Sequence, residues 1–437
     1  MFIGRKEERK SLESVYATDR SNLLVLYGKE GIGKTALALH FAQNKKTIYE
    51  RFLPAGESEH ERLVKETFDK IKNGDYKQEE KTILIFDEFH HIESKSIYSD
   101  IVFILNNEET CGRFMILMLS SSINFVENSM IELDPGFASS ITGIVKIQPI
   151  SFAQMVEWFP NKSVEECIII RSILGGVPKY LSMWDKSKGL RENIINLFLT
   201  RQAPLIEEPE AVLRKELREL SSYNTILISL GRGLIKLNDL FLATGYSRAK
   251  ISVYIKNLIE MDVVEKLFSA NVKNVENTMK GLYRISDSLL SFYYAFVYPN
   301  ITRIELGKGS EVYDEMIGPA LNSYLRPFFA DVCREYLDLM SQYGKLDHEY
   351  SHWQTWYGKK GTIDIVGTDS KNNMICGICS FEDEISTIES FAELKALTAQ
   401  AGIKKCSFCL FSKNGFDSSI EELANAGEVT VASLKDF

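Results

Sequence analysis

The chain has 437 residues, of which 45% are apolar and 25% charged, and it carries a net charge of −9 at pH 7. A single hydrophobic core stops growing near about 250 to 300 residues, so about two to four domains are expected. The acidic balance excludes a protein that coats nucleic acid along its whole length, although one basic domain can exist within an acidic total. No apolar run reaches the roughly 18 residues that cross a membrane, and the N-terminus MFIGRKEERK is charged where a signal peptide is apolar. We therefore expect a cytoplasmic protein with no membrane partner.

The first predicted elements are a strand, a glycine-rich turn and a helix. An apolar strand over Leu23–Tyr27 leads into GKEGIGKT, which fits the pattern G-x-x-x-x-G-K-[ST], and a helix follows from about Thr35 to Gln43. Glycines permit the tight curvature with which successive backbone N–H groups surround a diphosphate, and the helix directs its positive N-terminal end at the anion. The predicted ATP-binding residues of this loop are Gly28, Lys29, Glu30, Gly31, Ile32, Gly33, Lys34 and Thr35.

A second strand supplies the acids that such a loop needs. Ile83–Phe86 is a short apolar run of the buried-strand type and ends in Asp87 and Glu88. Lys34 is expected to reach the β- and γ-phosphates of ATP. Thr35 and Asp87 are the expected ligands of Mg²⁺, and Glu88 is the expected general base for the attacking water.

A third apolar strand, Phe114–Ser122, ends in hydroxyls instead of carboxylates. In NTPases with this arrangement, a polar residue beside the acidic strand senses the γ-phosphate, and Ser121 or Ser122 is placed for that role, with Ser121 taken as the catalytic candidate. The alternative is that the serines only cap a loop. Strands alternating with helices predict an α/β fold with a doubly wound parallel sheet of the P-loop NTPase type.

Several segments together resemble a known family. FIGRKEE, YGKEGIGKT, ILIFDEF, the strand ending in SSS, IVKIQPISFAQM and GGVPKYL are similar to the archaeal-type ATPases of the STAND class, relatives of AAA+ proteins that carry a C-terminal domain of unknown function. The resemblance covers essentially the whole chain. It implies that Phe2, Ile3 and Arg5 lie near the adenine. It also implies that Pro178, in the turn 175–178, belongs to a helical lid over the nucleotide.

The chain departs from this family at one position. The family usually has an arginine in a short turn before the strand expected at Ile144–Ile147, whereas Ser140 stands at about that place here. An arginine there can stabilise charge on the γ-phosphate, so its replacement affects the expected rate of hydrolysis more than the expected binding of ATP.

The middle of the chain predicts a winged helix-turn-helix. Short amphipathic helices precede a turn at 244–246, and a third helix over about Ser247–Met261 is followed by the strands VVEKLF and GLYRISD. Ile251, Ile255, Leu258 and Ile259 are expected to face inward, with Arg248, Lys250, Lys256 and Asn257 outward. The modest local excess of basic residues would favour contact with phosphates, so DNA is one expected partner. The resemblance to STAND proteins, in which winged helices often act as clamps on the nucleotide domain, makes such a packing role the favoured interpretation.

The C-terminal region, from about Lys308 to Phe437, reads as helix, strand, strand, helix, strand and resembles a restriction-endonuclease-like PD-(D/E)xK domain. Such a nuclease holds metal with several carboxylates and orients water with a lysine. Asp364 matches one acid of that pattern. The other positions are occupied by Ala330, Ile378 and Ser380, so we expect no nuclease activity.

The same region contains Cys376-x-x-Cys379 and Cys406-x-x-Cys409, among seven cysteines in the chain. The spacing is that of a four-thiolate zinc site. The flanking residues are those of apolar strands, however, and residues three apart on a strand face opposite sides. Buried structural cysteines are therefore the favoured interpretation, with zinc as the alternative.

These features predict a P-loop ATPase core over 1–156, a helical lid over 157–205, a winged helix over 206–305 and a nuclease-like domain over 306–437. The leading hypothesis is an ATP- and Mg²⁺-dependent molecular switch with slow hydrolysis. The rival is a non-hydrolysing, nucleotide-bound regulator that binds DNA. The sequence names no protein partner, and a homo-oligomer is open.

Overall fold

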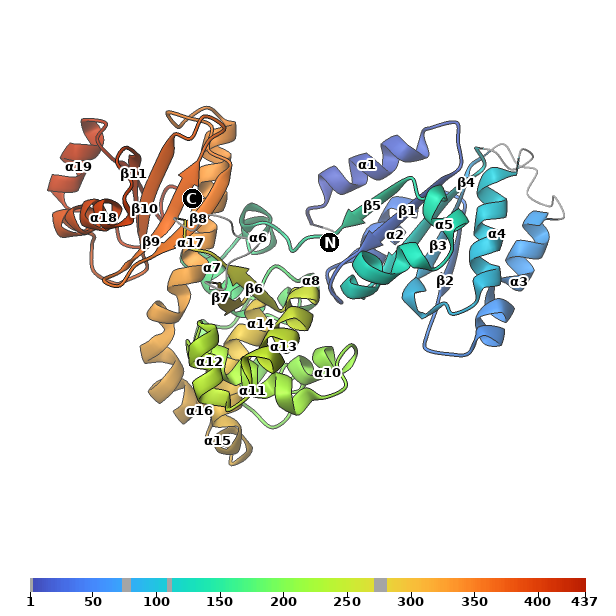
Figure 1. Ribbon diagram of the computed structural model, residues 1–437, viewed down its shortest axis with the longest axis horizontal. Coiled ribbons are helices and arrows are strands. Elements are labelled where there is room, and N and C mark those ends of the chain that lie inside the picture. Colours follow the sequence, from blue (N-terminus) through green and yellow to red (C-terminus); the bar gives the residue numbers. More distant parts are fainter. Residues whose placement is uncertain (1–2, 73–79, 108–111, 271–280) are drawn as a thin grey trace. The chain divides into compact units, whose positions relative to one another are not determined.

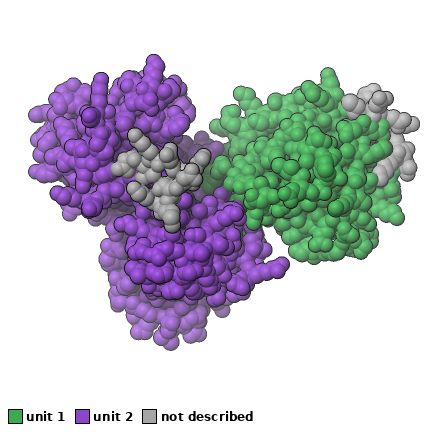
Figure 2. All heavy atoms as spheres, viewed as in Figure 1, with its two compact units in different colours: residues 1–150, 177–180 green, residues 151–176, 181–437 purple. Residues whose placement is uncertain are grey.

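The computed structural model describes residues 3–72, 80–107, 112–270 and 281–437 (Figure 1). The chain divides into two compact units (Figure 2). The first unit comprises residues 1–150 and 177–180, and the second comprises residues 151–176 and 181–437. Among the described residues, no helix combines the length and the apolar character that crossing a membrane requires.

The first unit is built on a five-stranded sheet in the order β2-β3-β4-β1-β5, with every neighbouring pair parallel. The central strands β1, β3 and β4 are buried along their whole length, which explains why they read as continuous apolar runs. The parallel α/β sheet predicted from the sequence is thereby confirmed. The strands are β1 (Asn22–Tyr27), β2 (Thr47–Arg51), β3 (Thr82–Asp87), β4 (Phe114–Ser120) and β5 (Gly143–Lys146).

Helices cover the sheet and complete its core. The helices are α1 (Lys6–Tyr16), α2 (Lys34–Ala42), α3 (Glu57–Lys72), α4 (Lys95–Asn106) and α5 (Pro135–Ser140), with short helical turns at Phe89–His91, Phe125–Ser129 and Met130–Glu132. In α4, Ile97, Ile101 and Ile104 recur at helical spacing and are at most 1% exposed. They pack in one cluster with alternate side chains of the central strands, so the other strand side chains face the opposite side of the sheet.

Two local predictions in this unit were wrong. Strand β4 ends at Ser120 instead of Ser122, because the Ser120 hydroxyl accepts a hydrogen bond from the Ser122 N–H and donates one to its carbonyl, each of 3.1 Å. The turn expected around Ser140 is helix α5, which Asp134 caps by accepting a 2.8 Å bond from the Phe137 N–H. The Ser140 hydroxyl donates to the Gly136 carbonyl within this helix.

The second unit begins with a run of helices. They are α6 (Phe152–Trp158), α7 (Val164–Leu174), α8 (Pro178–Leu181, of which only Leu181 lies in this unit), α9 (Leu190–Phe198), α10 (Glu208–Arg214), α11 (Leu220–Gly231), α12 (Leu237–Thr244) and α13 (Arg248–Glu260). The antiparallel pair β6 (Val264–Leu267) and β7 (Leu282–Ile285) follows. Helix α13 starts at a Ser247 cap and buries Ile251, Ile255 and Leu258, whereas Ile259 is only half-buried.

The last part of the chain forms a second five-stranded sheet in the order β12-β11-β10-β9-β8. The pairs β8–β9 and β9–β10 are antiparallel, and β10–β11 and β11–β12 are parallel. Its strands are β8 (His352–Tyr357), β9 (Thr362–Thr368), β10 (Met374–Ser380), β11 (Ser407–Ser412) and β12 (Thr430–Ser433). The preceding helices are α14 (Ser288–Phe292), α15 (Ile301–Glu305), α16 (Gly309–Val312) and α17 (Gly318–Gln342), and α18 (Ile388–Ala401) and α19 (Ser418–Asn425) lie between the later strands. The predicted helix, strand, strand, helix, strand order corresponds to α17, β9, β10, α18 and β11, and the structure adds β8, α19 and β12.

The cysteines of this sheet lie on its strands or directly beside them. Cys376 and Cys406 pack in the hydrophobic cluster that includes residues of α18, whereas Cys379 is buried outside this cluster. The two cysteines of β10 therefore face different sides of the sheet, as strand geometry requires. Among the residues that the structure describes, no group of three or more His, Cys, Asp or Glu side chains is arranged to hold a metal.

Candidate functional site

The loop between β1 and α2 needs glycine at defined positions. Gly28, Gly31 and Gly33 have φ values of 145°, 75° and 98°, a region that other residues rarely adopt. A Cβ on Gly28 would lie 2.7 Å from the Ile147 carbonyl oxygen, and one on Gly31 would lie 2.6 Å from the Lys179 Cβ. The chain therefore turns tightly here. Helix α2 begins immediately after Gly33, so the first backbone N–H groups of the helix continue those of the loop.

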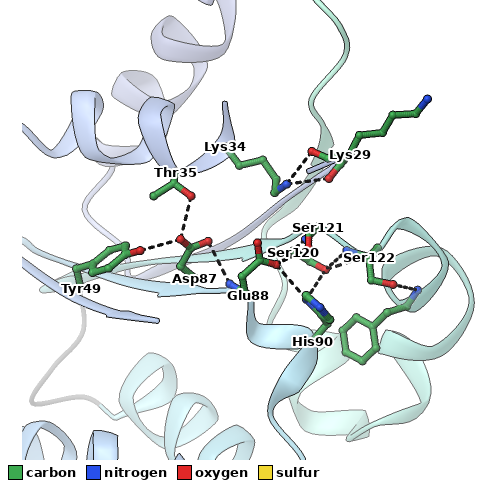
Figure 3. A network of polar contacts seen from close by, with 12 residues as sticks. Lys29, Lys34, Thr35, Tyr49, Asp87, Glu88, His90, Ser120, Ser121 and Ser122 are labelled. Atoms are coloured by element: carbon green, nitrogen blue, oxygen red, sulfur yellow. Dashed lines mark hydrogen bonds and ion pairs between the residues drawn. The ribbon is translucent and has the colours of Figure 1, made fainter. Parts of the chain in front are cut away.

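Lys34 spans the inside of this loop (Figure 3). Its Nζ donates to the carbonyls of Gly28 at 2.8 Å and of Lys29 at 3.0 Å, and the residue is only 4% exposed. Burial lowers the pKa of Lys34, and the nearby carboxylates, chiefly Glu88, act in the opposite direction. The ammonium group is hydrogen-bonded to backbone carbonyls of the glycine loop. A phosphate oxygen can replace these carbonyls as the acceptor.

Asp87, at the end of β3, faces the start of α2. Its Oδ2 accepts hydrogen bonds from the Thr35 hydroxyl at 2.9 Å and from the Tyr49 hydroxyl at 2.7 Å. Burial and this bond to Asp87 raise the pKa of Tyr49. The two predicted metal ligands, Thr35 and Asp87, are thus in direct contact. Tyr49 was missed from the sequence, where only its place on the strand neighbouring β3 connects it to Asp87.

Glu88 turns away from Asp87 toward β4. It has a φ of 56°, and its Oε2 accepts hydrogen bonds from the Ser121 N–H at 3.0 Å and hydroxyl at 2.6 Å. The Nδ1 of His90 lies 3.3 Å from the same oxygen. Ser122 instead accepts a 3.3 Å bond from the Phe125 N–H, so this serine caps the following helical turn. Ser121 and His90 are therefore the neighbours of the expected general base (Figure 3).

The N-terminal segment contacts the loop directly. Arg5 is 4% exposed, and its guanidinium donates to the Ile32 carbonyl at 3.0 Å and to Glu8 at 2.9 Å. Ile3 is half-buried, and Phe2 lies outside the described residues. Arg5 thus supports the backbone of the nucleotide loop.

The segment Val177–Tyr180 approaches the loop from the other end of this unit's sequence. The Lys179 N–H donates to the Gly31 carbonyl at 3.2 Å, and a Cβ on Gly33 would lie 3.8 Å from the Pro178 ring. With these contacts, the unit gathers Arg5, Lys34 and Pro178 around one glycine-rich turn, although they are far apart in the sequence.

Comparison with known families agrees with this geometry. Residues 24–134 match the ATPase family associated with various cellular activities (AAA). Residues 293–392 match a family, DUF234, described as archaeal and bacterial proteins of unknown function. The fold and the site of the first unit are thus those of an AAA-type ATPase domain, over residues 24–134. The chain joins this ATPase domain to a C-terminal DUF234 domain, the family combination that the sequence indicated.

Two proteins of one organism are similar to this chain over different lengths. An uncharacterized protein of Methanocaldococcus jannaschii is 27% identical over 395 residues, which cover 85% of each chain. An uncharacterized ATP-binding protein of the same organism is 46% identical over 46 residues, 10% of this chain and 78% of that protein.

Among solved structures, a Walker-type ATPase of Pyrococcus abyssi matches with a TM-score of 0.49 and 15% identity over 67% of this chain and 96% of its own. The ORC2 protein of Aeropyrum pernix matches with a TM-score of 0.42 and 14% identity over 69% and 95%.

Proposed function

We propose that the protein is an ATP- and Mg²⁺-dependent molecular switch in which slow hydrolysis in the first unit changes the state of the second. The residues present fit both ligands. Glycines at 28, 31 and 33 add no side chains to the loop, and Lys34 places its ammonium group on the loop carbonyls. The Thr35 hydroxyl and the Asp87 carboxylate are hard oxygen donors that already face each other at 2.9 Å. Bound Mg²⁺ neutralises phosphate charge there.

The protein's own residues supply the remaining chemistry. The loop amides and the α2 N-terminus bind the phosphates, and the Lys34 ammonium exchanges its carbonyl partners for phosphate oxygens. Glu88 removes a proton from the attacking water. Ser140, bonded to its own helix, supplies no positive charge, which supports slow hydrolysis.

The observation that carries the switch is the attachment of Val177–Tyr180 to the glycine loop. The Lys179 N–H bonds to Gly31, while the residues before and after this segment belong to the second unit. We expect a phosphate that binds the loop to alter the backbone at Gly31, and the segment joins that backbone to the chain of the second unit. This supports the lid role of Pro178 that the family resemblance implied.

Within the second unit, the helix before this segment is joined to the C-terminal domain. Arg171 of α7 forms an ion pair with Glu335 of α17, and Glu335 also accepts a 2.8 Å bond from the Phe152 N–H. The Tyr324 hydroxyl on α17 donates to the Ser172 carbonyl at 3.2 Å. Displacement of α7 is therefore expected to move α17 with it.

The test combines binding, turnover and hydrogen exchange. The parent should bind ATP and hydrolyse it slowly, Glu88→Gln should bind without turnover, and Lys34→Ala should lose binding, whereas the exposed-residue control Lys10→Ala should not. ATP should change amide exchange in α7 and α17 of the parent and not of Lys34→Ala. Binding by Lys34→Ala equal to the parent would overturn the nucleotide site. Binding by the parent without turnover would favour the non-hydrolysing regulator.

We propose that the C-terminal sheet is a PD-(D/E)xK-like domain without nuclease activity. The buried Asp364 is paired with Arg326 of α17 at 3.1 Å and accepts a 2.9 Å bond from the Cys379 N–H. A guanidinium thus stands beside the one retained acid, where a nuclease places metal. Magnesium-dependent DNA cleavage that disappears in Asp364→Ala would contradict this assignment.

The helices α11, α12 and α13 with β6 and β7 support the proposal of a winged helix. Arg248, Lys250 and Lys256 are exposed along α13, which favours contact with DNA phosphates. Arg284 of β7 is paired with Asp331 of α17 at 3.2 Å, which joins the strand pair to the helix before the C-terminal sheet. The alternative role is a clamp on the nucleotide domain. Duplex binding that weakens with salt and with Lys250→Ala would select the first role, and unaltered binding in that variant would select the second.

A further inference from the structure

The carboxylate of Glu88 has one occupied and one open oxygen. Oε2 accepts from the Ser121 N–H and hydroxyl at 3.0 and 2.6 Å and lies 3.3 Å from His90 Nδ1 (Figure 3). Within the described part of the chain, Oε1 has no hydrogen-bond donor. This asymmetry suits a general base, because the bonds to one oxygen orient the carboxylate while the other oxygen is available to receive the proton.

His90 reaches Glu88 because the chain turns sharply after β3. Glu88 adopts a left-handed φ of 56°, and the short helical turn Phe89–His91 follows, closed by a 3.1 Å bond from the His91 N–H to the Glu88 carbonyl. The His90 ring is held against His91, with ring centroids 4.0 Å apart. The imidazole is thus fixed beside the carboxylate by backbone geometry and by packing.

The partners of His90 determine which ring nitrogen carries the proton. Nδ1 faces the Glu88 carboxylate and also lies 3.2 Å from the Ser120 hydroxyl oxygen. The Ser120 hydrogen is donated to the Ser122 carbonyl, so the Ser120 oxygen at 3.2 Å and Oε2 of Glu88 at 3.3 Å are both acceptors that face the one Nδ1 proton. Burial, with His91 and Lys34 nearby, lowers the pKa of His90 to about 4, so the ring is neutral near pH 7 and its single proton is on Nδ1.

Ser121 is engaged in the same way. A hydroxyl has one hydrogen, and that of Ser121 is donated to Glu88 at 2.6 Å. While this bond exists, the hydroxyl cannot donate to a γ-phosphate. The Ser121 hydroxyl therefore contacts Oε2 of Glu88, the same oxygen that His90 approaches.

We propose that His90 is a positioning residue for hydrolysis and that, with Ser121, it clamps Oε2 of Glu88 so that Oε1 faces the attacking water. The inference rests on the proposed ATP hydrolysis. In that step an O–H bond of water breaks and its proton passes to Oε1. The water oxygen forms a bond to the γ-phosphorus as the bond to the ADP oxygen breaks, and Glu88 then releases the proton to solvent.

Matched variants separate positioning from simple packing. The amide nitrogen of His90→Asn takes the place of Nδ1, whereas that of His90→Gln takes the place of Nε2. His90→Gln should lower kcat by about tenfold or more, with the Kd for ATP changed less than about twofold, because only the orientation of the base is lost. His90→Asn should retain most of kcat, and His352→Gln, which changes an exposed histidine of β8, is the control and should resemble the parent.

Equal loss in the Asn and Gln variants, parental kcat in His90→Gln, or a parallel rise in Kd would overturn the proposal and leave the ATPase assignment standing. A parent that binds ATP without turnover would overturn both. A second readout does not depend on turnover: long-range ¹H–¹⁵N spectra of the parent should show His90 protonated at Nδ1 and bare at Nε2 near pH 7. The opposite tautomer would overturn the proposal at any level of activity.

Discussion

The Thr35 hydroxyl donates a 2.9 Å hydrogen bond to Oδ2 of Asp87, which lies 52 residues later in the chain. This bond joins the first turn of α2 to the end of β3, and it brings together two oxygens that serve as Mg²⁺ ligands in P-loop proteins. Tyr49 donates to the same carboxylate oxygen from the neighbouring strand β2. The predictions that follow test this site and the contacts that connect it to the rest of the protein.

The Thr35 hydroxyl should decide how strongly Mg²⁺ promotes ATP binding. Thr35→Val keeps the shape of the side chain and removes the oxygen, so the gain in ATP affinity on adding Mg²⁺ should fall by roughly tenfold, about 1.4 kcal/mol. Thr35→Ser keeps the oxygen and should behave as the parent. Calorimetric titration of each protein with ATP, once in the presence of Mg²⁺ and once in the presence of EDTA, measures the difference. The same Mg²⁺ dependence in the valine variant and the parent would exclude Thr35 as a ligand.

Gly31 should be required for docking of the segment Val177–Tyr180. An added Cβ would lie 2.6 Å from the Lys179 Cβ, and the residue has a φ of 75°. Gly31→Ala should therefore destabilise the first unit by about 1 to 3 kcal/mol. Gly56→Ala, where a Cβ meets nothing within 4 Å, is the matched control. Denaturant unfolding followed in both variants checks the prediction, which fails if their midpoints coincide.

His90 should remain uncharged well below the usual pKa of histidine. Burial, with the neighbouring His91 and Lys34, lowers the folded-state pKa of His90 to about 4. An unfolded chain takes up this proton near pH 6.5, so the contribution to stability is complete above about pH 6.5 and decreases as the pH falls toward 4, by about 3 kcal/mol in total. An NMR titration of the histidine resonances gives the pKa directly. A midpoint near 6.5 for His90 would contradict the prediction.

Glu335 should contribute to the junction between α7 and α17. It accepts from Arg171 and from the Phe152 N–H, so Glu335→Ala leaves a half-buried guanidinium and a backbone donor without this acceptor. We expect a loss of about 1 to 2 kcal/mol from the stability of the second unit, reduced by the partial exposure of the pair. The exposed pair Arg191–Asp314 provides the control, because Asp314→Ala should cost little. Urea unfolding of both variants measures their free energies of unfolding. Equal losses of stability in Glu335→Ala and Asp314→Ala would refute the role of Glu335.

The nucleotide loop and its acids were predictable because their signals are local. Glycines at 28, 31 and 33 have positive φ values that only this residue adopts readily, and the buried parallel strands β1, β3 and β4 require continuous apolar runs. These requirements act on neighbours in the chain, so they appear as a pattern. Strand ends were predicted less well. Ser120 ended β4 through a turn that its hydroxyl forms with Ser122, and a run of serines does not indicate which one turns.

By itself, the sequence determined the parallel sheet, the glycine loop and the positions of Lys34 and Asp87, because backbone geometry and burial restrict the residues at those positions. Only the tertiary structure decided that Tyr49 bonds to Asp87, that His90 contacts Glu88 and that Arg171 pairs with Glu335. Each of these contacts depends on how a turn or helix brings one polar side chain to another. Many polar residues in the chain are capable of the same bonds, so residue type alone does not select the partners.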